Sequence, residues 1–249
     1  MFGRIIVGMI SDYFSWHVAL GLVGIISLLF SLWFWIGLPK QQHFKRKQLT
    51  LSDILSSFFQ HLKSLRLMCL FGTGFLLMGG FVTLFNYISF PLTKPPYSLS
   101  QTAVGFVVYL FGTFSSACGW GSLQIQREKH PFSSIGMGIM LTGLLLTLLL
   151  PLMIKVIGVA VFTFGFFDSH AIVSSCVGTF AENDKAQAAP LYLFFYYVGS
   201  SLIETFGGTI WHLFHWNGVV SLIGLCIILS FILETPLWKV RRHVMKKHE

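Results

Sequence analysis

Three ionisable side chains lie midway along apolar segments that are long enough to cross a membrane. Asp168 and His170 lie within residues 152–178, and Glu204 lies within residues 188–212. A charged group at the centre of a bilayer costs roughly 2.5–3.5 kcal/mol or more, so it usually belongs to a route for protons, ions or substrate. We therefore predict that Asp168, His170 and Glu204 form a proton or substrate pathway.

Helical spacing suggests which polar side chains accompany these groups. Glu204 shares a helix face with Tyr197 and Ser201, and His170 is expected to pair with Ser174. Polar groups inside a bilayer must find partners or a water-filled cavity. The residues predicted to line such a cavity are Asn86, Tyr109, Tyr197, Ser201 and Arg4.

Each assignment has a structural alternative. His170 can be a neutral imidazole that hydrogen-bonds between two helices. Glu204 can be an acidic residue with no functional role. Arg4 can bind an anionic substrate, pair with a carboxylate, or extend to the membrane interface, and we favour the last of these.

The apolar segments define an all-α polytopic membrane protein. The chain is 54% hydrophobic and 10% charged, with a mean hydropathy of +0.73. A bilayer is crossed by about 20 apolar residues in a helix. Seven runs of this size are predicted, after a shorter apolar piece at residues 2–11: 17–38, 67–90, 102–123, 132–150, 152–178, 188–212 and 217–236.

The basic residues predict the orientation, because cytoplasmic loops retain Lys and Arg. Alternate gaps between the spans hold 14 basic residues on one side and 2 on the other, with Arg4 in the short piece. We therefore expect the 39–66 loop and the C-terminus to be cytoplasmic. The same distribution accounts for the net charge of +8 and argues against nucleic-acid binding.

The gaps also predict how the chain is organised. Residues 1–38 read as the remnant of an N-terminal half, with half a span and one full span. Residues 39–66 form a basic cytoplasmic linker with an amphipathic helix, either on the membrane surface or as a soluble linker helix. Residues 67–238 form a six-helix C-terminal half, and residues 239–249 form a basic cytoplasmic tail.

Motifs for other activities are missing from the sequence. The glycine clusters lie in apolar spans, where small residues permit close helix packing, and none has the context of a nucleotide-binding loop. There is no G-x-S-x-G or H-E-x-x-H motif, and the four cysteines lack metal-ligand spacing. The sequence thus predicts neither an enzyme nor a cofactor or metal site.

Several segments resemble a known transporter family. Gly3-Arg4, Gly8, Asp12 and Ser15-Trp16 are similar to the fifth and sixth helices of the major facilitator superfamily, particularly its YnfM-type branch of bacterial efflux-like permeases. The tenth and eleventh helices of that branch resemble Gly165-Phe166-Phe167, His170, Lys185-Ala186-Gln187-Ala188, Tyr196-Tyr197-Val198-Gly199-Ser200-Ser201 and Gly207-Gly208.

The resemblance implies a bundle of twelve helices in two halves, of which this chain would lack about four N-terminal helices. It implies secondary active transport of a small molecule by alternating access, as a proton-coupled efflux antiporter of the bacterial inner membrane. The expected partners are the substrate, protons, the lipid bilayer and a separately encoded N-terminal half. The alternative is a truncated remnant or regulatory membrane fragment that does not transport.

Overall fold

The fold is a bundle of helices in a computed structural model that describes residues 7, 10, 14–38, 61–105, 133–181 and 185–245. Residues 101, 185–186 and 236–245 are described by their backbone alone. The helices are α2 (Trp16–Gly37), α4 (Leu65–Tyr87), α5 (Ser89–Thr93), α6 (Gln101–Val104), α9 (Ser133–Leu146), α10 (Leu152–Phe180) and α11 (Lys185–Met245). The described residues contain no strand, and the predicted all-α class is confirmed.

Four stretches of the described residues are long and apolar enough to cross a bilayer, at Trp16–Gly37, Leu65–Thr93, Leu152–Phe180 and Gln187–Thr235. The last of these covers two of the predicted spans, because α11 is a hairpin of two helical arms. The chain reverses at His215, whose φ of 54° and ψ of −145° are not helical. The predicted gap between residues 212 and 217 contains this reversal. Most of the predicted 102–123 span and most of the predicted linker helix lie outside the described residues.

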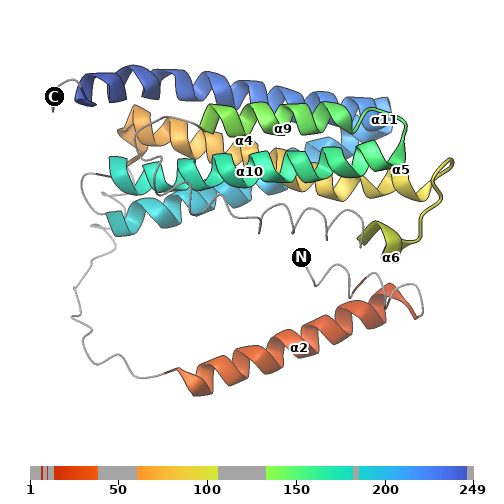
Figure 1. The fold of residues 1–249 in the computed structure, drawn as a ribbon. Coiled ribbons are helices and arrows are strands. Elements are labelled where there is room, and N and C mark those ends of the chain that lie inside the picture. The colour runs from red at the N-terminus through yellow and green to blue at the C-terminus, as the bar shows by residue number, and fades with distance from the viewer. Residues whose placement is uncertain are drawn as a thin grey trace.

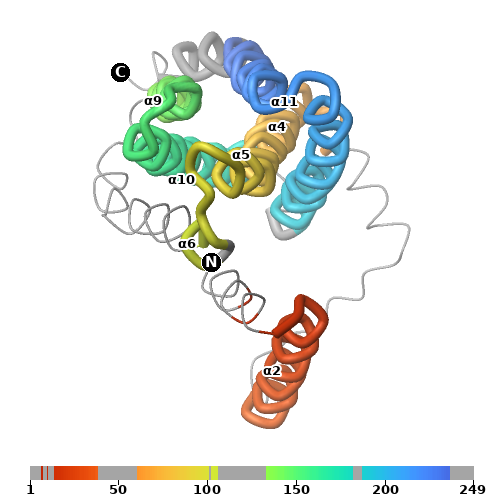
Figure 2. The backbone as a smooth tube through the Cα atoms, turned by 90° about the vertical axis from the view of Figure 1, so that its right-hand side faces the viewer, coloured from red at the N-terminus to blue at the C-terminus, as the bar shows by residue number. Residues whose placement is uncertain are grey.

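The hydrophobic core lies where α4, α9, α10 and the second arm of α11 meet (Figures 1 and 2). Phe81 of α4 stacks on Phe166 of α10 with ring centroids 4.1 Å apart. Met140 of α9 and Ile223 of α11 are fully buried in the same cluster. A second cluster joins the opening turns of α4 to the end of α10 and the start of α11. The first arm of α11 is thereby held against α4.

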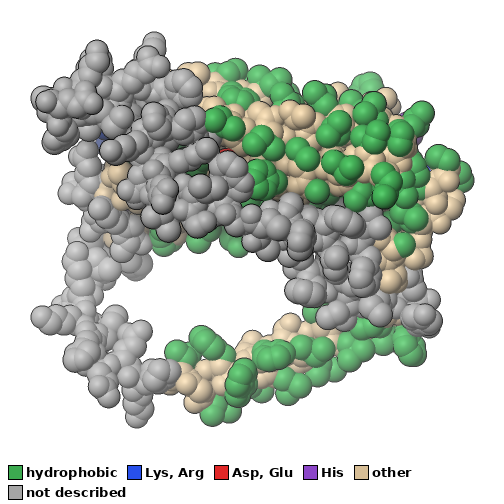
Figure 3. All heavy atoms as spheres, viewed as in Figure 1, with side chains coloured by type: hydrophobic (Ala, Val, Ile, Leu, Met, Phe, Trp, Pro, Cys, Tyr) green, Lys and Arg blue, Asp and Glu red, His purple; other side chains and the backbone are tan. Residues whose placement is uncertain are grey.

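Helix α2 lies apart from this bundle (Figures 1 and 2). Ser15 accepts a hydrogen bond from the Val18 amide at the start of the helix, and Ala19 is its only buried residue. Hydrophobic side chains cover α2 and much of the visible surface of the bundle (Figure 3). Such a surface is typical of helices that face lipid or other helices rather than water.

Glycines bring α9 and α10 into backbone contact. A Cβ at Gly143 would lie 2.2 Å from the Phe162 amide nitrogen, and one at Gly165 would lie 2.4 Å from the Gly136 carbonyl oxygen. Small residues let membrane helices approach this closely. The predicted packing role is therefore confirmed at Gly136, whereas a Cβ at Gly138 would meet nothing within 4 Å.

Gly143→Ala should lower the free energy of unfolding by about 1–3 kcal/mol, the usual cost of overpacking. The added methyl group meets backbone atoms of α10, which cannot move without separating the helices. Gly138→Ala is the matched control on the same helix, because alanine favours a helix by about 1 kcal/mol over glycine and has room there. Thermal unfolding in detergent measures both variants, and equal destabilisation would contradict the observed contact.

Candidate functional site

The central polar contact joins α4 to the first arm of α11. Asn86 donates a hydrogen bond from Nδ2 to Oε1 of Glu204. The Tyr87 hydroxyl donates to the backbone oxygen of Glu204 at 3.2 Å. Glu204 is half-buried, and it forms no ion pair with any basic side chain that the structure describes. The pair thus places one carboxylate and one amide at an interface between two membrane-spanning helices.

Close packing of the two helices positions this pair. A Cβ at Gly199 would lie 2.2 Å from the Phe75 carbonyl oxygen, and one at Gly79 would lie 2.2 Å from Cδ1 of Ile203. Both contacts lie on the same interface, and on α4 they are about three and two helical turns from Asn86. The glycines therefore set the separation across which Asn86 reaches Glu204.

Tyr197 and Ser201 precede Glu204 on the same arm of α11. Both residues are exposed, Tyr197 at 61%, and the Tyr197 ring packs edge to face on Tyr196 at 5.5 Å. Their predicted role as cavity-lining residues remains a prediction. Tyr109 and Arg4 lie outside the residues that the structure describes.

His170 lies in an aromatic cluster between α10 and α11. Its Nδ1 is 3.0 Å from the Tyr192 hydroxyl, and its ring lies parallel to Phe166 at 5.7 Å and 4.9 Å from Tyr196. The predicted pairing of His170 with Ser174 is wrong, because the Ser174 hydroxyl donates to the Ala171 carbonyl oxygen at 3.0 Å. A contact between helices therefore replaces the expected contact along one helix.

Asp168 faces α9, whereas Glu204 faces α4. The Asp168 side chain is half-buried, and a Cβ at Gly136 would lie 2.7 Å from its Oδ2 atom. The absence of a side chain at Gly136 leaves the room that this carboxylate occupies. Together with His170, between α10 and α11, the predicted pathway residues therefore lie on three different helix interfaces.

Glu234 is a buried acid that the sequence analysis missed. It is 4% exposed near the end of α11 and accepts a hydrogen bond from the Ser133 hydroxyl at the start of α9. The Ser134 hydroxyl lies farther from it, at 3.5 Å, and Ser169 of α10 donates to the Ser133 carbonyl oxygen at 3.2 Å. Its place inside the predicted 217–236 span was the signal that could have identified it.

Lys155 is a second buried charge that the sequence analysis did not single out. It is 5% exposed in the first turn of α10, and its Nζ donates to the Thr147 carbonyl oxygen at 2.5 Å. Trp216 donates to the same oxygen from Nε1 at 3.2 Å. Because this oxygen lies just after the C-terminus of α9, the lysine compensates the negative end of that helix.

Ser133→Ala should lower the free energy of unfolding by about 1–3 kcal/mol, because it leaves a buried carboxyl group without its close donor. Ser134→Ala is the matched control and should cost much less, because its hydroxyl is 3.5 Å from Glu234, a weak hydrogen-bond distance. Chemical unfolding in detergent compares the two variants. Similar losses would show that the Ser133 hydroxyl has no special part in holding Glu234.

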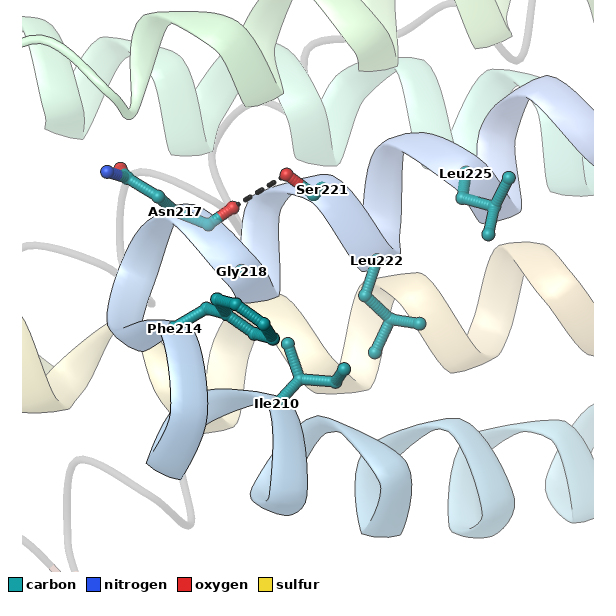
Figure 4. A pocket seen from close by; sticks show the side chains of 7 residues that line it. All are labelled: Ile210, Phe214, Asn217, Gly218, Ser221, Leu222 and Leu225. Carbon is teal, nitrogen blue, oxygen red and sulfur yellow. Dashed lines mark hydrogen bonds between the residues drawn. The ribbon is translucent and has the colours of Figure 1, made fainter.

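A groove of about 620 Å³ lies at the hairpin of α11. Figure 4 shows Phe214 and Ile210 of the first arm facing Leu222 of the second arm, while the Ser221 hydroxyl bonds to the Asn217 carbonyl oxygen at 2.9 Å. None of its lining residues is charged or belongs to the predicted pathway. The described residues also contain no cluster of three His, Cys, Asp or Glu side chains that could hold a metal ion.

Comparisons with known proteins agree on one family. The sequence model of the Major Facilitator Superfamily matches residues 1–203. The uncharacterized MFS-type transporter YybF of Bacillus subtilis is 43% identical over 241 residues, and the inner membrane transport protein YnfM of Escherichia coli is 41% identical over 239 residues. An uncharacterized transporter of Buchnera aphidicola subsp. Schizaphis graminum is 40% identical over 239 residues.

These alignments cover nearly all of this chain but only part of each relative. They include 96%, 95% and 95% of the chain, and 58%, 57% and 58% of YybF, YnfM and the Buchnera protein, respectively. The chain therefore spans less than three fifths of the length of these relatives.

Proposed function

This chain belongs to the Major Facilitator Superfamily, a family of transporters rather than enzymes, and from that premise we propose that it forms part of a secondary active transporter. The proposed activity is the movement of a small molecule across a bacterial inner membrane by alternating access, coupled to protons in the direction of efflux. The relatives named as transporters support the activity, and the name of YnfM supports the inner membrane.

The observation that carries this proposal is the contact between Asn86 and Glu204. Both side chains come from membrane-spanning helices, and both remain half-buried. A carboxylate inside a membrane-spanning segment costs free energy, so such a residue usually has a function. A hydrogen bond between two helices can also form and break as those helices move relative to each other.

We propose that Asp168 and Glu204 change their protonation or their substrate contacts during the transport cycle. Because they face different helices, α9 and α4, a rearrangement of the bundle can change the surroundings of one without the other. His170 and Tyr192 add a third contact between helices, a hydrogen bond of 3.0 Å between α10 and α11 that the same rearrangement can break. This arrangement supports a pathway role for His170.

We also propose that the C-terminus lies in the cytoplasm. The tail beyond residue 238 holds five basic residues, which favour the cytoplasmic side. A green fluorescent protein fused after Glu249 should fluoresce in cells, because it folds poorly after export through the general secretion route. An alkaline phosphatase fused at the same place should be inactive, and the reverse pattern would contradict the orientation.

Transport itself is tested with the purified full chain in liposomes that contain a pH-sensitive dye. A panel of cationic, neutral and anionic small molecules is added after a proton gradient has been imposed. We expect at least one compound to discharge the gradient faster than in protein-free liposomes. A correctly inserted chain that responds to none of them would favour the non-transporting alternative.

A further inference from the structure

We propose that a strip of five side chains on α4, α5 and α11 binds an amphipathic organic cation with an aromatic ring. This Glu204 strip consists of Asn86, Tyr87, Phe90, Glu204 and Trp211. The inference rests on the proposed transport function and specifies the chemical class of its substrate.

The charge of the strip favours a cation. Asn86 donates to one oxygen of Glu204, Oε1, and so orients the carboxylate without neutralising it. Glu204 has no ion pair among the described residues, so its charge has no compensating basic side chain there. A positively charged ligand would supply that compensation, and the low dielectric of the membrane would strengthen the attraction.

The rest of the strip is aromatic. Trp211 stacks on Phe90 with centroids 5.2 Å apart and lies 6.2 Å from the Tyr87 ring. The Tyr87 hydroxyl donates to the backbone oxygen of Glu204, so Tyr87 joins this part of α11 to the aromatic cluster. Aromatic faces attract both flat rings and cations.

Gly207 and Gly208 have no side chains, which leaves room on α11 for Tyr87. A Cβ at Gly207 would lie 3.1 Å from Cε2 of Tyr87, and one at Gly208 would lie 3.0 Å from its hydroxyl oxygen. Tyr87 therefore packs closely against α11 at these two glycines.

The exposure and length of the strip define the shape of the ligand. Phe90 is 45% exposed, and Asn86, Tyr87, Glu204 and Trp211 are all partly exposed. Glu204 and Trp211 are seven residues apart on one helical arm, which is about 10 Å along its axis. A ligand whose cationic centre and aromatic ring are separated by up to that distance can contact both ends.

Binding is tested with radiolabelled tetraphenylphosphonium and the full chain in lipid nanodiscs, with protein-free nanodiscs as the background. We expect saturable binding that ethidium displaces. Tetraphenylborate, which has nearly the same shape and the opposite charge, should not displace it. Binding equal to that of empty nanodiscs, or preferential binding of tetraphenylborate, would overturn the proposal.

Variants locate the site. Glu204→Gln should weaken tetraphenylphosphonium binding at least tenfold, whereas Glu204→Asp, which keeps the charge, should retain most of it. Trp211→Leu should weaken binding about three- to tenfold through loss of the aromatic face. Trp33→Leu is the control, because Trp33 lies on α2, apart from the strip. Unchanged affinity in folded Glu204→Gln protein would refute the site.

The outcomes separate this inference from the proposed function. Coupled transport of a neutral or anionic compound by a chain that does not bind tetraphenylphosphonium would refute the cation class alone. Saturable, Glu204-dependent binding without flux of any compound would support the strip and count against the transporter.

Discussion

Glu204→Gln should reduce substrate-coupled proton flux at least about tenfold while the chain remains folded and inserted. Glutamine has nearly the same shape as glutamate, and its carbonyl oxygen can still accept the hydrogen bond from Asn86. The substitution therefore removes the charge and the titratable proton but keeps the contact between α4 and α11. The flux is measured in liposomes with the compound that gives the strongest response in the wild-type chain.

Two further variants serve as controls. One changes Asp168, the other proposed pathway acid, and the other keeps a negative charge at position 204. Asp168→Asn should also depress coupled flux, and Glu204→Asp should preserve more of it than Glu204→Gln. Circular dichroism and gel filtration confirm that each variant is folded. Wild-type flux from both Glu204→Gln and Asp168→Asn would remove these carboxylates from the mechanism.

Gly199→Val should abolish the native packing of α4 against α11. Even the first carbon of a side chain at Gly199 would lie 2.2 Å from the Phe75 carbonyl oxygen and 2.7 Å from its Cα. These are backbone atoms, so the whole of α4 would have to move, and the Asn86–Glu204 contact would be lost with it. Overpacking by one methylene costs about 1–3 kcal/mol, and valine adds more bulk than that.

Fluorescence-detected gel filtration measures the yield of monodisperse protein. Thermal unfolding then measures the stability of that monodisperse protein. Gly178→Val is the matched control, because a Cβ at Gly178 on α10 would meet nothing within 4 Å. We expect Gly178→Val to behave like the wild type and Gly199→Val to aggregate. Two equally stable variants would contradict the close approach of the two helices.

The helices could be predicted because a membrane imposes its thickness on the sequence. The predicted 17–38 and 152–178 spans agree within two residues at each end with Trp16–Gly37 and Leu152–Phe180. The boundaries follow from where apolar residues begin and end, which is local information. The reversal within α11 was predicted on the same basis, although His215 itself does not resemble a usual turn residue.

The contacts of the site could not be predicted in the same way, because they join residues far apart in the chain. Asn86 and Glu204 are separated by 118 positions, and Ser133 and Glu234 by 101. Helical periodicity identifies which residues share a face, but it does not identify the helix that covers that face.

His170 illustrates how a tertiary contact displaced a local one. Ser174 lies one turn away on the same helix, but its hydroxyl is bound to a backbone carbonyl of that helix. The imidazole therefore reaches across to Tyr192 of α11. Only the packing of α10 against α11 reveals this partner.

The central claim is that Glu204 faces an aqueous pathway rather than lipid, and the reactivity of a single cysteine at position 204 tests it most directly. Glu204→Cys is made in a chain whose four native cysteines have been replaced, and a charged, membrane-impermeant thiol reagent is added from each side in turn. Ile228→Cys, on the exposed apolar second arm of α11, is the control for a lipid-facing position. We predict that the cysteine at position 204 is labelled from at least one side, with a rate that changes when the proton gradient is reversed, while the control is not labelled. A cysteine at position 204 that is as unreactive as the control from both sides would contradict the account.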